Sequence, residues 1–85
     1  MTTPLSLAVA QVNPTVGDVD GNAELIRSAR AEAYGADLLV TGELSLSGYP
    51  PEDLVLKRAF QDRVEGVVEA LAGETAAGGP ALLVG

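Results

Sequence analysis

The sequence has 85 residues, 47% of them hydrophobic, and its twelve acidic and five basic residues give a net charge of −7. This composition is typical of a globular protein, and the acidic excess disfavours nucleic acid and anionic membranes as partners. Cysteine and histidine are both absent, so these residues offer no thiol nucleophile, disulfide or histidine metal ligand.

The N-terminal stretch predicts a strand followed by a loop. Residues 5–12 (LSLAVAQV) are mostly aliphatic and lie between Pro4 and Pro14, which favours a buried parallel strand. This stretch lacks the basic region of a signal peptide, and no apolar run approaches the roughly 18 residues of a membrane span. A cytoplasmic location is therefore expected. Residues 13–21 (NPTVGDVDG) are dense in turn formers.

A helix is expected next, with either Asp20 or Asn22 as its N-cap. Gly35 fits the C′ position just after its last turn. The buried stripe of this helix is predicted from apolar residues at helical spacing, namely Leu25, Ile26, Ala29 and Ala33.

A second strand is predicted over residues 36–41 (ADLLVT), which show no polar alternation and so favour cover on both faces. A turn with Pro50 and Pro51 follows, and Glu52 with Asp53 is expected to open a short helical turn.

The second long helix is predicted over residues 57–72, with Gly73 as its stop and residues 78–80 as the loop that follows. Residues 81–85 (ALLVG) then begin a third strand. The apolar stripe of this helix is the strongest periodic signal in the chain: Phe60, Val64, Val67, Val68 and Leu71.

The resulting β-α-β-α-β order predicts an α/β fold with a parallel sheet and right-handed crossovers. The sequence ends at the tip of a strand that reads as buried. We therefore expect residues 1–85 to be the N-terminal part of a larger domain, incomplete at its C-terminal end.

Glu43 is the candidate catalytic residue, because an apolar strand delivers it to the carboxyl edge of the sheet, where α/β enzymes build sites. Its apolar neighbours Leu39 and Leu46 suggest partial desolvation, which would make the carboxylate a better base. The alternative is an ordinary solvated or ion-paired acid at a strand end.

Other polar residues are weaker candidates. Asp18 and Asp20 could bind a cation but are more simply turn residues, and Tyr49 could face a pocket or cover the sheet edge. The glycines form neither of the common phosphate-binding patterns, which disfavours a nucleotide site within these residues.

Three segments, LAVAQVNPTVGDVDGN, ELSLSGYPPEDL and ALLVG, resemble the start of the nitrilase (carbon–nitrogen hydrolase) superfamily. Within it, the nearest resemblance is to the glutaminase domains of glutamine-dependent NAD synthetases. The resemblance implies a four-layer α-β-β-α sandwich, of which residues 1–85 would be the first part, and a Glu–Lys–Cys triad.

By this resemblance Glu43 is the general base that takes the proton of the nucleophilic cysteine during glutamine hydrolysis. Neither partner lies in these residues: Lys57 does not occupy the motif position of the family lysine, and no cysteine is present. Both are expected further along the chain, so the 85 residues alone should be inactive.

The resemblance also implies partners and cofactors. They are glutamine as substrate, a downstream synthetase domain that uses ATP and Mg²⁺ to convert deamido-NAD to NAD, and assembly of identical subunits. A stand-alone nitrilase-type amidase and a non-catalytic α/β module remain alternatives. The sequence departs from the family at Thr41-Gly42, where Phe-Pro is frequent, and glycine would loosen the backbone that presents Glu43.

Overall fold

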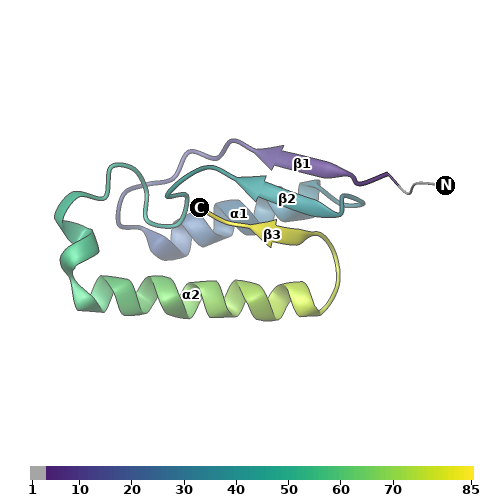
Figure 1. The fold of residues 1–85 in the computed structure, drawn as a ribbon. Helices are drawn as coiled ribbons and strands as arrows, with labels where there is room; N and C mark the ends of the chain where they lie inside the picture. Colours follow the sequence, from purple (N-terminus) through teal and green to yellow (C-terminus); the bar gives the residue numbers. More distant parts are fainter. Residues whose placement is uncertain (1–3) are drawn as a thin grey trace.

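In a computed structural model, residues 4–85 form one parallel sheet with two long helices (Figure 1). The strand order is β1-β2-β3, and both pairs are parallel. The predicted β-α-β-α-β order is confirmed, with shorter strands than expected. The elements are β1 (Leu7–Ala10), α1 (Val19–Glu32), β2 (Leu38–Thr41), the short 3₁₀ helix η1 (Glu52–Leu56), α2 (Arg58–Ala76) and β3 (Ala81–Leu83).

Both helices lie on the same side of the sheet, as right-handed crossovers between strands in sequential order require. Leu39 and Leu82 point to the helical side, whereas Leu7, Val9 and Leu83 lie on the other face and are 56%, 75% and 58% exposed. The expectation that the second strand is covered on both faces is therefore wrong for the described residues. Their lack of polar alternation reflects apolar side chains on both faces, only one of which is packed.

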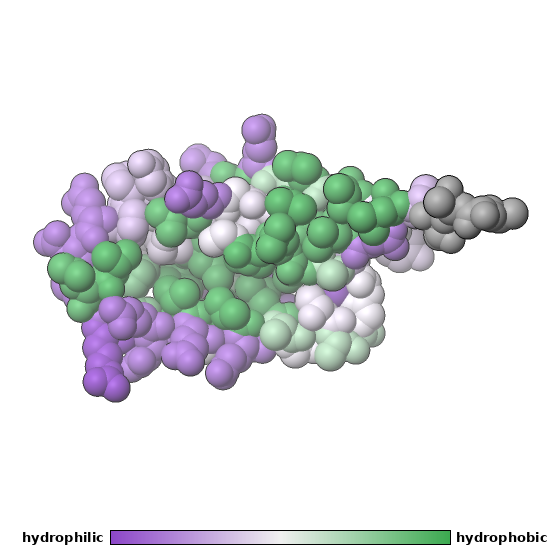
Figure 2. Space-filling view, in the orientation of Figure 1, coloured by the Kyte–Doolittle hydropathy of each residue, from purple (hydrophilic) through white to green (hydrophobic). Residues whose placement is uncertain are grey.

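The core is small and lies between the sheet and the helices. Figure 2 shows further apolar side chains gathered over the strands, with hydrophilic ones along α2. The buried apolar residues that form the core of the described chain are Val19, Ala23, Ile26, Leu39, Leu46 and Leu71.

Helix α1 begins earlier than predicted. Its N-cap is Asp18, whose carboxylate accepts a hydrogen bond from the Gly21 amide at 3.1 Å, so the prediction of Asp20 or Asn22 is wrong. The buried residues of α1 lie toward its N-terminal end and are Val19, Asn22, Ala23 and Ile26, whereas Ala29 and Ala33 are half-buried. Of the predicted stripe only Ile26 is buried. At the other end Ala33 is the C-cap, so C′ is Tyr34; Gly35, with φ of 93°, lies one residue beyond the C′ position that was predicted for it.

Helix α2 passes through Gly73, where it was predicted to stop, and continues to Ala76. Gly78 and Gly79, both with positive φ, make the turn into β3 instead. The predicted apolar stripe faces the sheet, but only Leu71 is buried and Val68 is 47% exposed. The reason is a cavity of about 810 Å³ between α2 and β3 that leaves this face partly uncovered.

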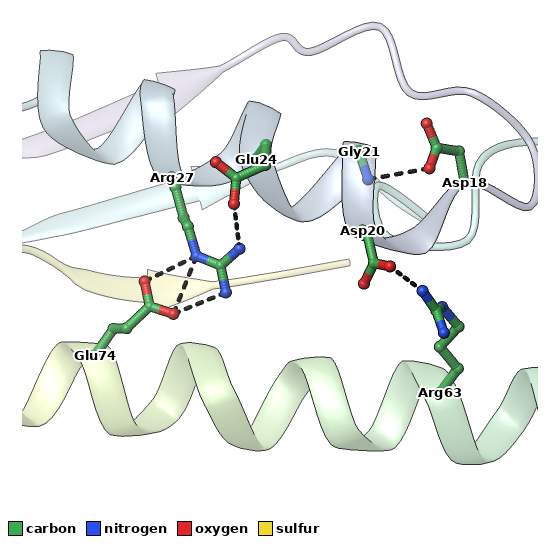
Figure 3. A network of polar contacts seen from close by, with 7 residues as sticks. All are labelled: Asp18, Asp20, Gly21, Glu24, Arg27, Arg63 and Glu74. Carbon is green, nitrogen blue, oxygen red and sulfur yellow. Dashed lines mark hydrogen bonds and ion pairs between the residues drawn. The ribbon is translucent and has the colours of Figure 1, made fainter.

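Ion pairs connect the two helices (Figure 3). The Arg27 guanidinium donates to both carboxylate oxygens of Glu74 on α2, at 2.8 to 3.0 Å, and also to Glu24 on its own helix. These hydrogen bonds hold the pKa of Arg27 above and the pKa of Glu74 below their usual values. Arg63 pairs with Asp20 nearer the start of α1.

Among residues 4–85, no helix combines the length and the apolar character needed to cross a bilayer.

Candidate active site

Glu43 lies two residues beyond the end of β2, at the carboxyl edge of the parallel sheet. It lines a depression of about 430 Å³ between the ends of β1 and β2. Crevices at this edge are where open α/β sheets bind ligands. The lining residues are Val9, Ala10, Gln11, Val12, Pro14, Thr41, Gly42, Glu43 and Ser45.

The carboxylate of Glu43 is exposed, and it makes no hydrogen bond or ion pair within residues 4–85. The expected partial desolvation is therefore not found in this part of the chain. Leu39 and Leu46, which were expected to shield it, are instead buried on the helical side of the sheet. The side chain is thus free to contact groups beyond those described.

The backbone beside Glu43 is strained. Leu44 has a φ of 55°, in the left-handed region that costs a non-glycine residue about 1 kcal/mol or more. The tight turn over residues 43–47 closes with a hydrogen bond from the Gly48 amide to the Leu44 carbonyl at 2.8 Å. Strain of this kind persists only where the surroundings hold the chain in place, and it is frequent at active sites.

One group of contacts holds this turn to β2 and to the residues after β3. The buried Ser45 hydroxyl lies 2.8 Å from the Thr41 hydroxyl and donates to the Gly85 carbonyl at 3.1 Å. The Gly85 amide in turn donates to the Thr41 hydroxyl at 3.2 Å. A side chain at Gly85 would collide with the Gly42 carbonyl oxygen, since an added Cβ would lie only 2.0 Å from it.

A second group of contacts holds the turn to the loop between β1 and α1. The Gly17 amide donates to the Ser47 carbonyl at 2.9 Å. Gly48, with φ of 83°, lies so close to this loop that an added Cβ would be 2.5 Å from the Val16 Cα. Asn22 on α1 joins the same contact by donating to the Leu46 carbonyl at 2.7 Å. The sequence indicated none of these roles, and Asn22 in particular was taken as a possible N-cap.

The other polar residues considered from the sequence lie outside the depression that Glu43 lines. Asp18 caps α1, whereas Asp20 lies inside α1 and pairs with Arg63 on α2, so the prediction that both are turn residues is wrong for Asp20. Tyr49 is 70% exposed and lines neither cavity described above, and Lys57 is exposed at the start of α2, as predicted. The part of the chain that the structure describes contains no cluster of three or more residues able to hold a metal ion.

Comparison with curated proteins gives matches over most of the sequence. A protein from Synechocystis is 49% identical over 79% of this chain, one from Thermotoga maritima is 43% identical over 95%, and one from Rhodobacter capsulatus is 42% identical over the whole chain. All three are named glutamine-dependent NAD(+) synthetase. The chain is homologous to part of these NAD(+) synthetases.

The homology is confined to a small segment of the NAD(+) synthetases. The chain spans 12%, 14% and 16% of the length of the three relatives. No family model matches the chain. The relationship to NAD(+) synthetases thus agrees with the resemblance seen in the sequence, whereas the assignment to a glutaminase domain and the role of Glu43 remain predictions.

Proposed function

We propose that the chain is the N-terminal part of the glutaminase domain of a glutamine-dependent NAD synthetase, with Glu43 as its general base. The proposal is based on the position of Glu43 in the fold. It lies at the carboxyl edge of the sheet, in a strained turn held on both sides, in a chain homologous to NAD(+) synthetases.

The proposed reaction is the hydrolysis of a glutamine carboxamide. Glu43 takes the thiol proton of a cysteine located outside these residues, and the thiolate attacks the carboxamide carbon to give a tetrahedral oxyanion. A lysine, also outside these residues, stabilises the oxyanion. The C–N bond then breaks, the nitrogen leaves as ammonia with the proton held by Glu43, and water hydrolyses the thioester to glutamate and free thiol.

In this proposal a synthetase domain of the same chain consumes the ammonia, using ATP and Mg²⁺ to convert deamido-NAD to NAD. That second site is proposed to lie outside residues 1–85. Assembly of identical subunits is proposed for the full-length protein by the same resemblance.

Substituting Glu43→Gln in the full-length protein tests the base directly. The glutamine side chain keeps the shape of glutamate but accepts no proton at neutral pH, so glutamine hydrolysis should fall by about 100-fold or more. NAD formation supplied with free ammonia should continue at the parent rate, because that reaction bypasses the glutaminase. Glu52→Gln, which removes another exposed carboxylate nine residues further on, is the matched control and should leave both rates unchanged.

The alternatives give different results in the same experiment. If Glu43→Gln hydrolyses glutamine at the parent rate, Glu43 is not the base. If the parent protein itself hydrolyses no glutamine, the non-catalytic α/β module becomes the better interpretation. If the parent protein hydrolyses amides but forms no NAD from deamido-NAD, ATP and ammonia, the stand-alone amidase is favoured.

A further inference from the structure

Asn22 is a polar side chain in the centre of the packed face of α1, where the flanking positions carry Val19, Ala23 and Ile26. It is 1% exposed. Its amide makes three hydrogen bonds, all to backbone groups outside its helix. The oxygen accepts from the Thr15 amide at 2.8 Å, and the nitrogen donates to the Thr15 carbonyl at 2.8 Å and to the Leu46 carbonyl at 2.7 Å.

This side chain joins three parts of the chain. It fixes both backbone groups of one residue in the β1–α1 loop and a carbonyl three residues after Glu43. An apolar residue of similar volume could fill the same space, but it would remove the partner of the Leu46 carbonyl, which is buried, and that of the Thr15 amide, which is partly buried. Asn22 therefore fixes how the β1–α1 loop meets the turn after β2, in addition to filling space in the core.

This contact is one of those that hold the turn that begins at Glu43. The side chain of Glu43 is exposed, whereas the backbone of Gly42 and Glu43 lies so close to Gly85 that a Cβ on Gly85 would collide with both residues. The backbone position of Glu43 is also set by the residues that follow it. Those residues are anchored at Leu46 by Asn22, and at Ser47 and Gly48 by the loop that Asn22 holds.

We propose that Asn22 is a positioning residue for Glu43, holding the turn over residues 43–47 against the β1–α1 loop so that the carboxylate meets the nucleophile in a productive geometry. The proposal rests on the proposed function of Glu43. Asn22 touches no substrate in this account and acts only through the backbone of the turn.

The test compares Asn22→Ala with Ile26→Ala in the full-length protein. Ile26 lies one turn further along the same face of α1 and is fully buried. It shares an apolar cluster with Leu46 but makes no side-chain hydrogen bond to the turn, so Ile26→Ala reports lost apolar packing without lost hydrogen bonds. Asn22→Ala should lower kcat for glutamine hydrolysis by up to about 100-fold, with a smaller change in KM. Ile26→Ala should lower the unfolding temperature at least as much but leave kcat close to the parent value.

A double variant shows whether Asn22 acts through Glu43. If it does, adding Asn22→Ala to Glu43→Gln should leave the residual rate of glutamine hydrolysis unchanged, because the group that Asn22 positions is already lost. Rate losses that multiply in the double variant would overturn the proposal. It would equally be overturned if Asn22→Ala lost no more kcat than Ile26→Ala while Glu43→Gln was inactive.

Two further measurements keep the outcome clear. The unfolding temperature reports whether each variant is folded, and NAD formation with free ammonia reports whether the synthetase reaction is intact. If Asn22→Ala is not folded, Gly48→Ala replaces it by disturbing the same contact from the opposite loop. A Gly48→Ala protein with the parent kcat would overturn the inference. If the single variant Glu43→Gln hydrolysed glutamine at the parent rate, the proposed function of Glu43 would instead be overturned.

Discussion

At the scale of single residues, the candidate base is exposed while the residues after it are held firmly. Ser45, Leu46 and Ser47 are buried and hydrogen-bonded to three other parts of the chain. Gly48 explains why the segment GYPPEDL opens with glycine, since its φ of 83° and its contact with Val16 both exclude a side chain. The strain at Leu44 is sustained by these contacts.

Gly42, by contrast, is not required by its surroundings. Its φ lies outside the left-handed region and an added Cβ would meet nothing within 4 Å. We expect Gly42→Ala to stabilise the protein by about 0.4–1 kcal/mol, because alanine reduces the freedom of the unfolded chain. Denaturant unfolding measures the change, and glutamine hydrolysis should not decrease. Gly48→Ala is the contrasting substitution and should be clearly destabilising; a loss of stability in Gly42→Ala would contradict this account of the site.

At the scale of elements, α1 and α2 are joined by a small apolar contact and by ion pairs at their edges. The cluster of Ala23, Ile26, Leu46 and Leu71 supplies the apolar part. Since α2 stands away from β3 along much of its length, the bidentate pair between Arg27 and Glu74 is one of the contacts that keep its C-terminal half close to α1.

This pair predicts a pH dependence of stability. The pKa of Glu74 is lowered by the hydrogen bonds from Arg27, so its stabilising contribution is present above the pKa of the unfolded chain and is lost as the pH falls through the folded pKa. At neutral pH, Glu74→Gln should be less stable than the parent, and the difference should shrink below about pH 4.5. It should also diminish in high salt.

Chemical unfolding followed by circular dichroism at neutral and acidic pH measures this difference. Glu69→Gln, which removes another exposed carboxylate on α2, is the control and should show a smaller difference at neutral pH. If the difference in stability between Glu74→Gln and the parent grew as the pH was lowered, the predicted direction of this pH dependence would be wrong.

At the scale of the whole molecule, the described chain is less compact than a closed domain of its length. Its radius of gyration is 13.6 Å, against about 12 Å for a compact domain of 85 residues. One face of the sheet carries exposed Leu7, Val9 and Leu83, and the space between α2 and β3 is open (Figure 2). Exposed apolar surface and an unpaired strand edge favour association.

We therefore expect the 85 residues, when produced alone, to be weakly stable and to self-associate. Analytical ultracentrifugation over a range of concentrations measures this. The double substitution Leu7→Thr and Val9→Thr keeps good strand propensity while making the open face more polar, so it should reduce association. A soluble monomer with a cooperative unfolding transition would contradict the expectation.

Local sequence patterns determined the order of the elements and the position of Glu43 beyond the second strand. Hydrophobic periodicity and turn residues act over a few neighbouring residues, so residues 5–12, 36–41 and 81–85 could be recognised as strands without knowledge of their partners. The short helical turn at Glu52 and Asp53 was correctly predicted for the same reason.

Only the tertiary structure decided the N-cap, the end of α2 and the supports of Glu43. Asp18 caps α1 in place of Asp20, and α2 passes Gly73 to end before Gly78, because each choice depends on how the helix packs and on where the chain must turn. The burial of Asn22 depends on loops that are distant in the sequence and meet only in the fold. Periodicity can place a carboxylate at the end of a strand, but the contacts that orient it arise between residues far apart along the chain.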